Sequence, residues 1–280
     1  MKRFLSAIAY TLMFLAIQAI AGIIVTFAYL IIKGDPHAKL PIEGTIVTML
    51  LFSLLIIAVF ILFKWFVPSQ AYLRTKPWDV CLWAIVAALG ALVPSLFLQE
   101  VFVPVWPEWI QQIVEQANQE LAQIMTVPGG YFIVALLAPV VEEMVFRGAV
   151  LRVLLPPTYH FSLLTSHFSP LTSIAVIVSA LLFALAHLNP AQMPHAFLIG
   201  ILLGWLYLRT GSILPGIVYH WANNTAAYIM FHMYPDPDAK LSDIIGGGNL
   251  TLLLAVAFSL CIFLPALYQL HLRMKPAERG

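Results

Sequence analysis

The amino-acid sequence predicts an all-α integral membrane protein, a bundle of eight transmembrane helices with a short interfacial helix and both termini in the cytoplasm. The first observation behind this fold class is composition, because 61% of the 280 residues are hydrophobic and only 10% are charged. A soluble domain carries about 25% charged residues, and it cannot hide so much apolar surface by growing larger. The other two observations are a series of long apolar segments and the way in which basic residues alternate between them.

The sequence indicates a single domain. No Ser/Gly-rich linker, charge block, low-complexity tract or internal repeat divides it, so we expect a single transmembrane domain over residues 1–280. Membrane lipid is the expected surrounding. No basic tract interleaved with aromatic side chains indicates nucleic-acid binding, so we expect no nucleic-acid partner.

The apolar segments set the number of spans, because a membrane-spanning helix needs about 20 predominantly apolar residues. Eight segments have this character, at about 4–32, 45–67, 78–103, 129–154, 170–187, 191–209, 212–233 and 249–271. Lys2 and Arg3 precede the first segment, as in a signal peptide, but its apolar run continues to Ile32. The apolar core of an excised signal peptide has only about 7–15 residues. We therefore expect an uncleaved first helix.

The basic residues set the orientation, since cytoplasmic loops are enriched in Lys and Arg. With the amino terminus inside, eight spans place 11 of the 14 basic residues in the cytoplasm and leave Lys33, Lys39 and Lys240 outside. An incorrect number of spans would break this alternation. We therefore predict a multi-pass protein with both termini cytoplasmic.

Residues 107–125, between the third and fourth spans, are amphipathic. Their apolar positions follow a helical stripe, with Gln, Asn and Glu on the opposite face. The stripe consists of Trp109, Ile110, Ile113, Val114, Ala117, Leu121, Ile124 and Met125. This pattern predicts a helix at the outer membrane interface. We favour packing over the mouth of the bundle over a role as a substrate lid.

The fourth span carries ionisable side chains, each of which costs about 2.5–3.5 kcal/mol within a span on insertion scales. Glu143 and Arg147 are four residues apart with the acid first, the favourable order for an ion pair, so we expect a structural pair. Successive helix residues point about 100° apart, so the two adjacent glutamates should not easily share a partner. Glu142 is then left over, and an unpartnered buried carboxylate suits a general base or acid. The alternative is that both glutamates are structural.

Two histidines stand out within the spans. His187 ends the fifth span, and His220 and Asn224 lie one turn apart on one face of the seventh. A single buried histidine is more often a packing residue, but two of them together with Glu142 indicate chemistry in a chain so poor in buried polar groups. We assign no role to the histidines near loops or span ends, which are His37, His160, His167, His195, His232 and His271.

Gly200 and Gly204 in the sixth span are four residues apart, a spacing that lets a neighbouring helix approach closely. We interpret the spacing as helix packing. It would bring the sixth span against the helices that carry Glu142, His187 and His220.

The polar motifs resemble those of the type II CAAX prenyl endopeptidases and of the bacteriocin-processing (Abi, CPBP) membrane proteases. The motifs, in order on successive helices, are Glu142-Glu143-x-x-x-Arg147, Phe183-x-x-x-His187 and His220-x-x-x-Asn224. The resemblance covers the helices of about 128–232. It leaves 1–127 and 249–280 as accessory spans.

This resemblance implies an eight-helix glutamic intramembrane protease that needs no cofactor. Carried onto this chain, it implies that Glu142 and His187 activate water, while His220 and Asn224 form an oxyanion site. The implied partner is a peptide or lipidated protein substrate, and the expected location is the bacterial cytoplasmic (inner) membrane.

Three other interpretations remain open. Glu142 with two histidines could be a catalytic zinc set, although no His-Glu-x-x-His is present and Asn224 would then be unexplained. A non-catalytic family member, acting as a bacteriocin immunity or scaffold protein, could keep the same residues. A proton-coupled transporter could also bury such groups, but the inverted repeats usual in that class are not found.

One expectation concerns depth. If the spans are straight, Glu142 and His187 differ in depth by about 10–20 Å, at 1.5 Å per residue. We therefore expect the turn at residues 188–190 to lie within the protein at membrane depth, beside a water-filled cavity.

Overall fold

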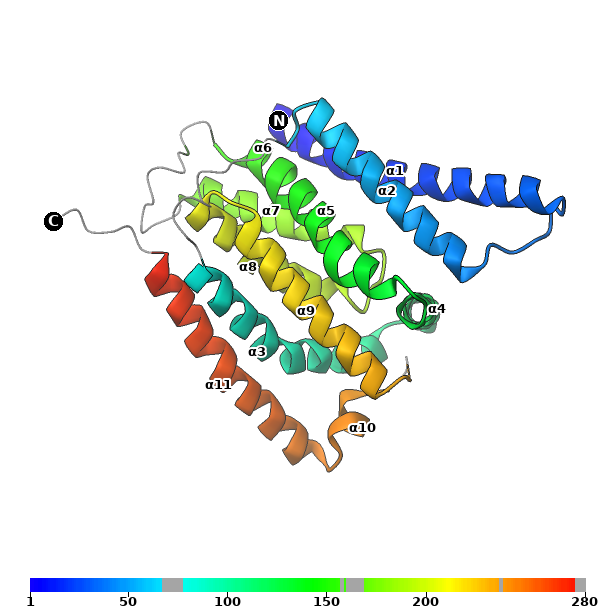
Figure 1. The fold of residues 1–280 in the computed structure, drawn as a ribbon. Helices are drawn as coiled ribbons and strands as arrows, with labels where there is room; N and C mark the ends of the chain where they lie inside the picture. Colours follow the sequence, from blue (N-terminus) through cyan, green and yellow to red (C-terminus); the bar gives the residue numbers. More distant parts are fainter. Residues whose placement is uncertain (67–77, 157–158, 160–168, 237–238, 275–280) are drawn as a thin grey trace.

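Helices make up all the regular secondary structure in the part of the chain that the computed structural model describes, residues 1–66, 78–156, 159, 169–236 and 239–274 (Figure 1). No strand occurs within these ranges, so the predicted all-α fold is confirmed. In chain order the helices are α1 (Lys2–Lys33), α2 (Ile42–Leu62), α3 (Trp78–Phe102), the 3₁₀ turn η2 (Val103–Val105), α4 (Glu108–Thr126), the π-helix η3 (Phe132–Leu137), α5 (Ala138–Val145), the π-helix η4 (Phe146–Leu151), α6 (Arg152–Leu154), α7 (Pro170–Ala186), α8 (Met193–Thr210), α9 (Leu214–Met233), α10 (Leu241–Ile245) and α11 (Asn249–Arg273).

Four of the described helices are long and apolar enough to cross a membrane: α1, α2, α3 with its extension to Val105, and α11. Their outer faces are apolar rather than polar. Phe27 on α1 is 64% exposed and Phe258 on α11 is 72% exposed. Apolar surfaces of this extent mark contact with lipid or another apolar partner. The fold is that of an integral membrane protein.

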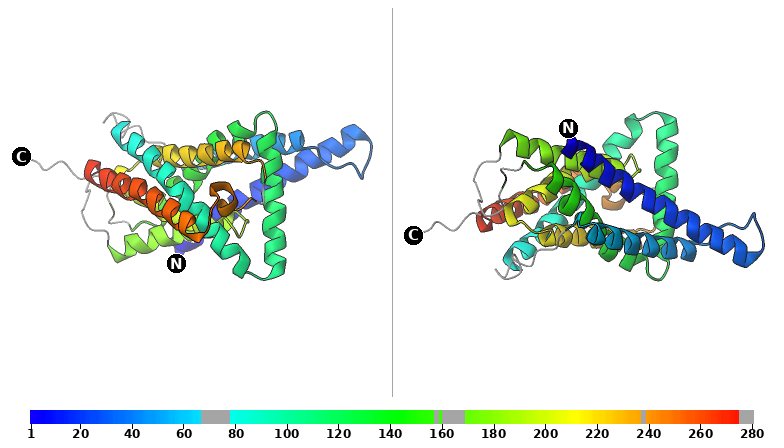
Figure 2. Two further views of the ribbon diagram at one scale, coloured as in Figure 1. Left: turned by 90° about the horizontal axis from the view of Figure 1, so that it is seen from below. Right: turned by 90° about the horizontal axis from the view of Figure 1, so that it is seen from above.

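The helices form three groups. Figure 1 shows α1 and α2 as a hairpin on one side and α3 with α11 on the other, with α5, α7, α8 and α9 between them. The helix α4 runs across one end of this bundle, as both views of Figure 2 show. Its predicted helical conformation is confirmed. The apolar stripe is divided, since Val114 is buried while Trp109 is 63% exposed.

The fourth predicted span is an interrupted helix. The α-helical turns of α5 lie between the π-helices η3 and η4, so the chain is helical from Phe132 to Leu154 but not uniformly so. Pro139, the second residue of α5, has no N–H to bond the carbonyl four residues earlier, and its ring crowds that carbonyl. The wider π turn just before it relieves this crowding and leaves carbonyls free for other donors. Such interruptions are frequent at functional sites.

The glycine spacing places α8 against α7. A Cβ atom on Gly200 would lie 2.9 Å from Ala180 Cα, and one on Gly204 would lie 2.9 Å from Val176 Cγ1. Both distances are too short for a real Cβ contact, so the two helices pack at a separation that only glycine permits.

Gly200→Ala is expected to lower the free energy of unfolding by about 1–3 kcal/mol, because the added methyl group overpacks the contact with Ala180. The matched control is Gly22→Ala in α1, where the new Cβ would meet only Thr48 Cγ2 at 3.9 Å. Replacing that helical glycine should be neutral or slightly stabilising. Thermal unfolding of both purified variants in one detergent measures the difference. Equal midpoints would contradict the packing role of Gly200.

Candidate active site

The Glu143–Arg147 pair lies at the centre of the bundle. Arg147 Nη1 donates to Glu143 Oε1 at 2.6 Å, and both side chains are fully buried. Arg147 Nη2 also donates to the Gly200 carbonyl at 3.3 Å. The guanidinium carbon lies 4.3 Å from the centre of the Phe183 ring, within cation–π range. One arginine therefore connects its own helix to α7 and α8.

The buried imidazole of His220 faces both glutamates. Its Nε2 lies 3.8 Å from Glu142 Oε2, and its Nδ1 lies 3.5 Å from Glu143 Oε1. The expectation that adjacent glutamates would not share a partner is therefore wrong. The imidazole has nitrogens on two sides of its ring, and α9 approaches α5 closely because Gly216 has no side chain. A Cβ at Gly216 would lie 2.7 Å from Glu143 Oε2.

Glu142 lies on the cavity side of the buried Glu143–Arg147 pair. Its side chain is 22% exposed, whereas that of Glu143 is completely buried. The Oε2 atom of Glu142 is buried and has no hydrogen-bond partner among the described residues. The exposed part of the side chain faces the cavity that Glu142 lines, so the carboxylate is open to a bound molecule there, as an acid or base requires.

His187 is held at the end of α7 by its own helix. Its Nδ1 lies 2.9 Å from the Phe183 carbonyl oxygen, which can only accept, so Nδ1 carries the proton and Nε2 is left as an acceptor. The Phe183 ring centre lies 4.7 Å from that of His187 and 5.9 Å from that of His220. Among the described residues, no carboxylate approaches His187 to ion-pair distance. Phe183 therefore fixes where the two imidazoles lie.

The amides of α9 are held by the π-helix. Asn224 Nδ2 donates to the Val134 carbonyl of η3 at 2.9 Å. Asn223 Nδ2 donates to Asn224 Oδ1 at 3.3 Å. Asn223 was not predicted from the sequence, yet its buried Oδ1 has no partner within the described part of the chain. Two adjacent amides, rather than one, thus belong to this site.

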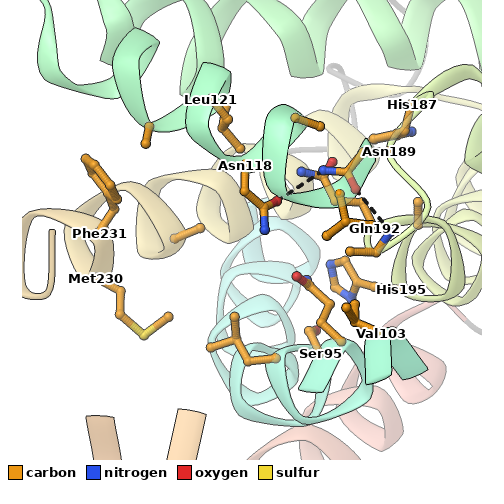
Figure 3. A pocket seen from close by; sticks show the side chains of 18 of the residues that line it. Ser95, Val103, Asn118, Leu121, His187, Asn189, Gln192, His195, Met230 and Phe231 are labelled. Atoms are coloured by element: carbon orange, nitrogen blue, oxygen red, sulfur yellow. Dashed lines mark hydrogen bonds between the residues drawn. The ribbon is translucent and has the colours of Figure 1, made fainter. Parts of the chain in front are cut away.

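A cavity of about 1030 Å³ brings the predicted residues together, and Glu142, His187, His220 and Asn224 all line it. Glu143 and Arg147 lie behind its wall. The helix α4 forms one side, so it is part of the cavity wall and not simply a cover. Figure 3 shows His187 and His195 on the side of the cavity formed by the α7–α8 segment.

The turn between α7 and α8 lies against this cavity. Leu188 adopts the left-handed conformation, with φ of 54°, which is uncommon for a residue with a branched side chain. Asn189 is buried, and its Oδ1 accepts from the Ala191 N–H at 3.0 Å. Its Nδ2 donates to Asn118 Oδ1 of α4 at 3.3 Å (Figure 3). The turn is thus tied to α4, while its depth in the membrane stays a prediction.

His195 is a second residue that the sequence analysis missed. It was assigned no role because it lies near a span end, yet it lines the same cavity from the first turn of α8. His187 and His220 line the same cavity. The signal in the sequence was its position eight residues after His187, across a short turn. Three imidazoles therefore face one space.

No group of three or more His, Cys, Asp or Glu side chains within the described ranges is arranged to hold a metal ion. Although Glu142 and His220 are neighbours, the imidazole of His220 also faces Glu143, and His187 is held through Nδ1 by Phe183. The observed side-chain positions therefore do not form a ready-made zinc site.

An apolar helical fold with a buried acid, imidazoles and amides around one cavity defines a membrane protein with an internal polar site. Comparison with known proteins identifies the class further. Residues 125–226, which contain all three motifs, match the family described as type II CAAX prenyl endopeptidase Rce1-like. The chain is also 24% identical over 183 residues to the membrane-embedded CAAX protease MroQ of Staphylococcus aureus (strain USA300), covering 63% of this chain and 69% of that protein.

No solved structure matches the chain significantly. The resemblance inferred from the motifs is confirmed by the family match and by this relative. The chain is therefore related to CAAX-type membrane proteases.

Arg147→Met is expected to lower the free energy of unfolding by about 3–5 kcal/mol, because Glu143 would remain as a buried charge without its partner. The control is Arg273→Met, which removes a partly exposed pair with Asp79 at 3.6 Å and should cost only about 0–1 kcal/mol. Thermal unfolding measures both. The double variant Glu143→Gln/Arg147→Met should recover part of the loss, and equal effects of the two single variants would contradict the structural role of the buried pair.

Proposed function

We propose that this protein is an intramembrane CAAX-type endopeptidase that hydrolyses peptide bonds of a lipidated or membrane-associated peptide, with a glutamate as its base. The observation that carries the proposal is the position of Glu142. Its unpartnered Oε2 lies 3.8 Å from His220 Nε2, at the wall of a cavity that His187 and Asn224 also line. The family match of the surrounding helices supports the same reaction.

In this proposal Glu142 removes a proton from a water molecule in the cavity. The Nε2 of His187 accepts a hydrogen bond from the second O–H of that water and orients it, since Nδ1 is fixed on the Phe183 carbonyl. That hydrogen stays on the attacking oxygen. The water oxygen attacks the peptide carbonyl carbon. As the C–N bond breaks, the proton held by Glu142 passes to the leaving nitrogen.

The negative charge that develops on the carbonyl oxygen of the substrate needs hydrogen-bond donors. His220 and Asn224 would supply them. The amide of Asn224 has a second N–H beyond the one bound to Val134. The Nε2 of His220, at 3.8 Å from Glu142 Oε2, forms no hydrogen bond with it and would donate to the substrate oxygen instead. By analogy with soluble proteases, one such donor contributes about 3–4 kcal/mol to transition-state stabilisation. The π-helix η3 contributes by holding the Asn224 amide in place.

The proposed topology has eight spans, both termini in the cytoplasm and α4 at the outer interface, in a bacterial cytoplasmic membrane. Helices lie over each of the eight predicted segments, and four of these helices are long and apolar enough in themselves to cross a membrane. The interrupted helix η3–α5–η4 and the helices α7, α8 and α9 all contribute residues to the cavity or to the ion pair behind it. We treat residues 1–280 as one domain with a catalytic core at 128–232.

Glu142→Gln is expected to lower the rate of peptide cleavage by about 10²–10⁴-fold, because the amide keeps the shape but cannot take a proton. His187→Ala should also reduce turnover. The matched control is Glu43→Gln, which neutralises an exposed glutamate in the first turn of α2 that does not line the cavity. Cleavage of a peptide library by the purified proteins measures all three. Full activity of Glu142→Gln would rule out its role as base.

The same assay separates the alternatives. A non-catalytic immunity or scaffold protein would bind peptides without cleaving them, in both the parent protein and the variants. A proton-coupled transporter would move its substrate across a vesicle membrane with no cleavage product.

Activity is expected to survive prolonged dialysis against a strong chelator, since the proposed chemistry uses only side chains and water. Metal analysis of the purified protein should find less than stoichiometric zinc. Loss of activity on chelation, with recovery on adding Zn²⁺, would favour the zinc interpretation, in which Glu142 and the histidines bind the ion.

A further inference from the structure

The α4 side of the cavity is acidic. Glu108, Glu115 and Glu120 line the cavity from this helix, which contains no Lys or Arg. Glu115 accepts a hydrogen bond from Gln119 of the same helix. Within the described part of the chain, none of the three carboxylates forms an ion pair with a Lys or Arg side chain. Their charges are therefore uncompensated by the protein.

The rest of the cavity does not balance these charges. Glu100, at the end of α3, lines it as well. Glu100 accepts two hydrogen bonds from Ser242, at 3.2 Å and 2.7 Å. Lys240 is the one Lys or Arg among the described residues that line the cavity. The electrostatic field on the α4 side of the cavity is therefore negative and attracts cations.

The carboxylates are spread along the helix. From Glu108 to Glu120 the helix rises by about 18 Å at 1.5 Å per residue, and at 100° per residue Glu120 is turned by about 120–140° from Glu108 and Glu115. A single metal ion or a small amine cannot contact all three at that separation. An extended peptide covers the same length with about five or six residues, so a segment with several basic side chains fits this spacing.

A second observation points to a peptide. Asn223 is only 9% exposed, lines the cavity, and keeps its Nδ2 on Asn224, which leaves the buried Oδ1 without a donor. A buried acceptor of this kind costs free energy unless a bound group donates to it. A peptide backbone N–H is such a donor, and Asn223 is adjacent in the chain to the proposed oxyanion donor.

We infer that the cavity takes a peptide segment rich in Lys or Arg, whose basic side chains bind the carboxylates of α4 while a backbone N–H donates to Asn223. This inference rests on the proposed function and adds the charge of the substrate to it. The basic residues lie in the part of the peptide at the cavity mouth, and the scissile bond lies deeper, beside Glu142 and His220.

The test uses peptides of one core sequence whose flanking positions are all Lys, all Gln or all Glu. The purified full-length protein is expected to cleave the Lys peptide with a kcat/KM about tenfold above that of the Gln peptide, and the Glu peptide least well. The preference should shrink as salt rises, because exposed charges are screened. Equal kcat/KM for Lys and Gln peptides would overturn the inference and leave the proposed function intact.

The triple variant Glu108→Gln/Glu115→Gln/Glu120→Gln is expected to lose most of the preference, measured as the ratio of kcat/KM for the Lys peptide to kcat/KM for the Gln peptide. Glu43→Gln is the matched control and should keep the preference. A preference that persists in the triple variant would overturn the assignment to α4. Asn223→Ala should raise KM for Lys and Gln peptides alike, and an unchanged KM would remove Asn223 from the inference.

Binding separates this inference from the proposed function. Fluorescence anisotropy of labelled peptides on Glu142→Gln measures binding without turnover, and that variant should bind the Lys peptide about tenfold more tightly than the Gln peptide. Charge-selective binding with no cleavage by the parent protein would refute the peptidase and support the inference. Binding without charge selectivity would refute the inference, whether or not the parent cleaves.

Discussion

The buried ion pair between Glu143 and Arg147 is the constraint on which the rest of the site depends. In apolar surroundings the two charges cannot separate without leaving one of them unpartnered, so the pair behaves as a rigid unit. Through Phe183 and the Gly200 carbonyl it sets the positions of α7 and α8, and through His220 that of α9. The direction in which Glu142 faces follows from this unit, because the two glutamates are adjacent.

The cavity separates recognition from chemistry. The reacting groups proposed here come from the helices at the centre of the bundle, where packing leaves little freedom. The acidic wall comes from α4, which is bound at its middle by Asn118 to Asn189 of the α7–α8 turn. That turn also follows directly after His187. A hydrogen bond therefore joins the α4 side of the cavity to the residue two positions after His187.

The sequence was informative where the contacts are local. The four-residue spacing of Glu143 and Arg147 predicted their contact, and the spacing of Gly200 and Gly204 predicted the close approach of α8 to a neighbour. Composition and hydropathy predicted the all-helical membrane fold. Contacts between distant segments were beyond this reasoning.

The shared contact of His220 with two glutamates depends on the missing side chain of Gly216. His195 reaches the cavity only because the chain reverses just before it. The unpartnered oxygen of Asn223 became visible only once every neighbouring donor had a position. None of these follows from local spacing, since each depends on how distant helices approach one another.

The π-helix η3 has a further consequence, because each π turn holds one residue more than the α turn it replaces. Removing one residue from 132–137 would restore α-helical spacing there and turn the following segment by about 100° about its axis relative to the preceding one. Glu142 would then no longer face His220. The extra residue in the π turn thus sets the rotation of the helix segment that carries Glu142. In a related chain, an insertion or deletion in this stretch would change the direction in which that glutamate points without altering any motif.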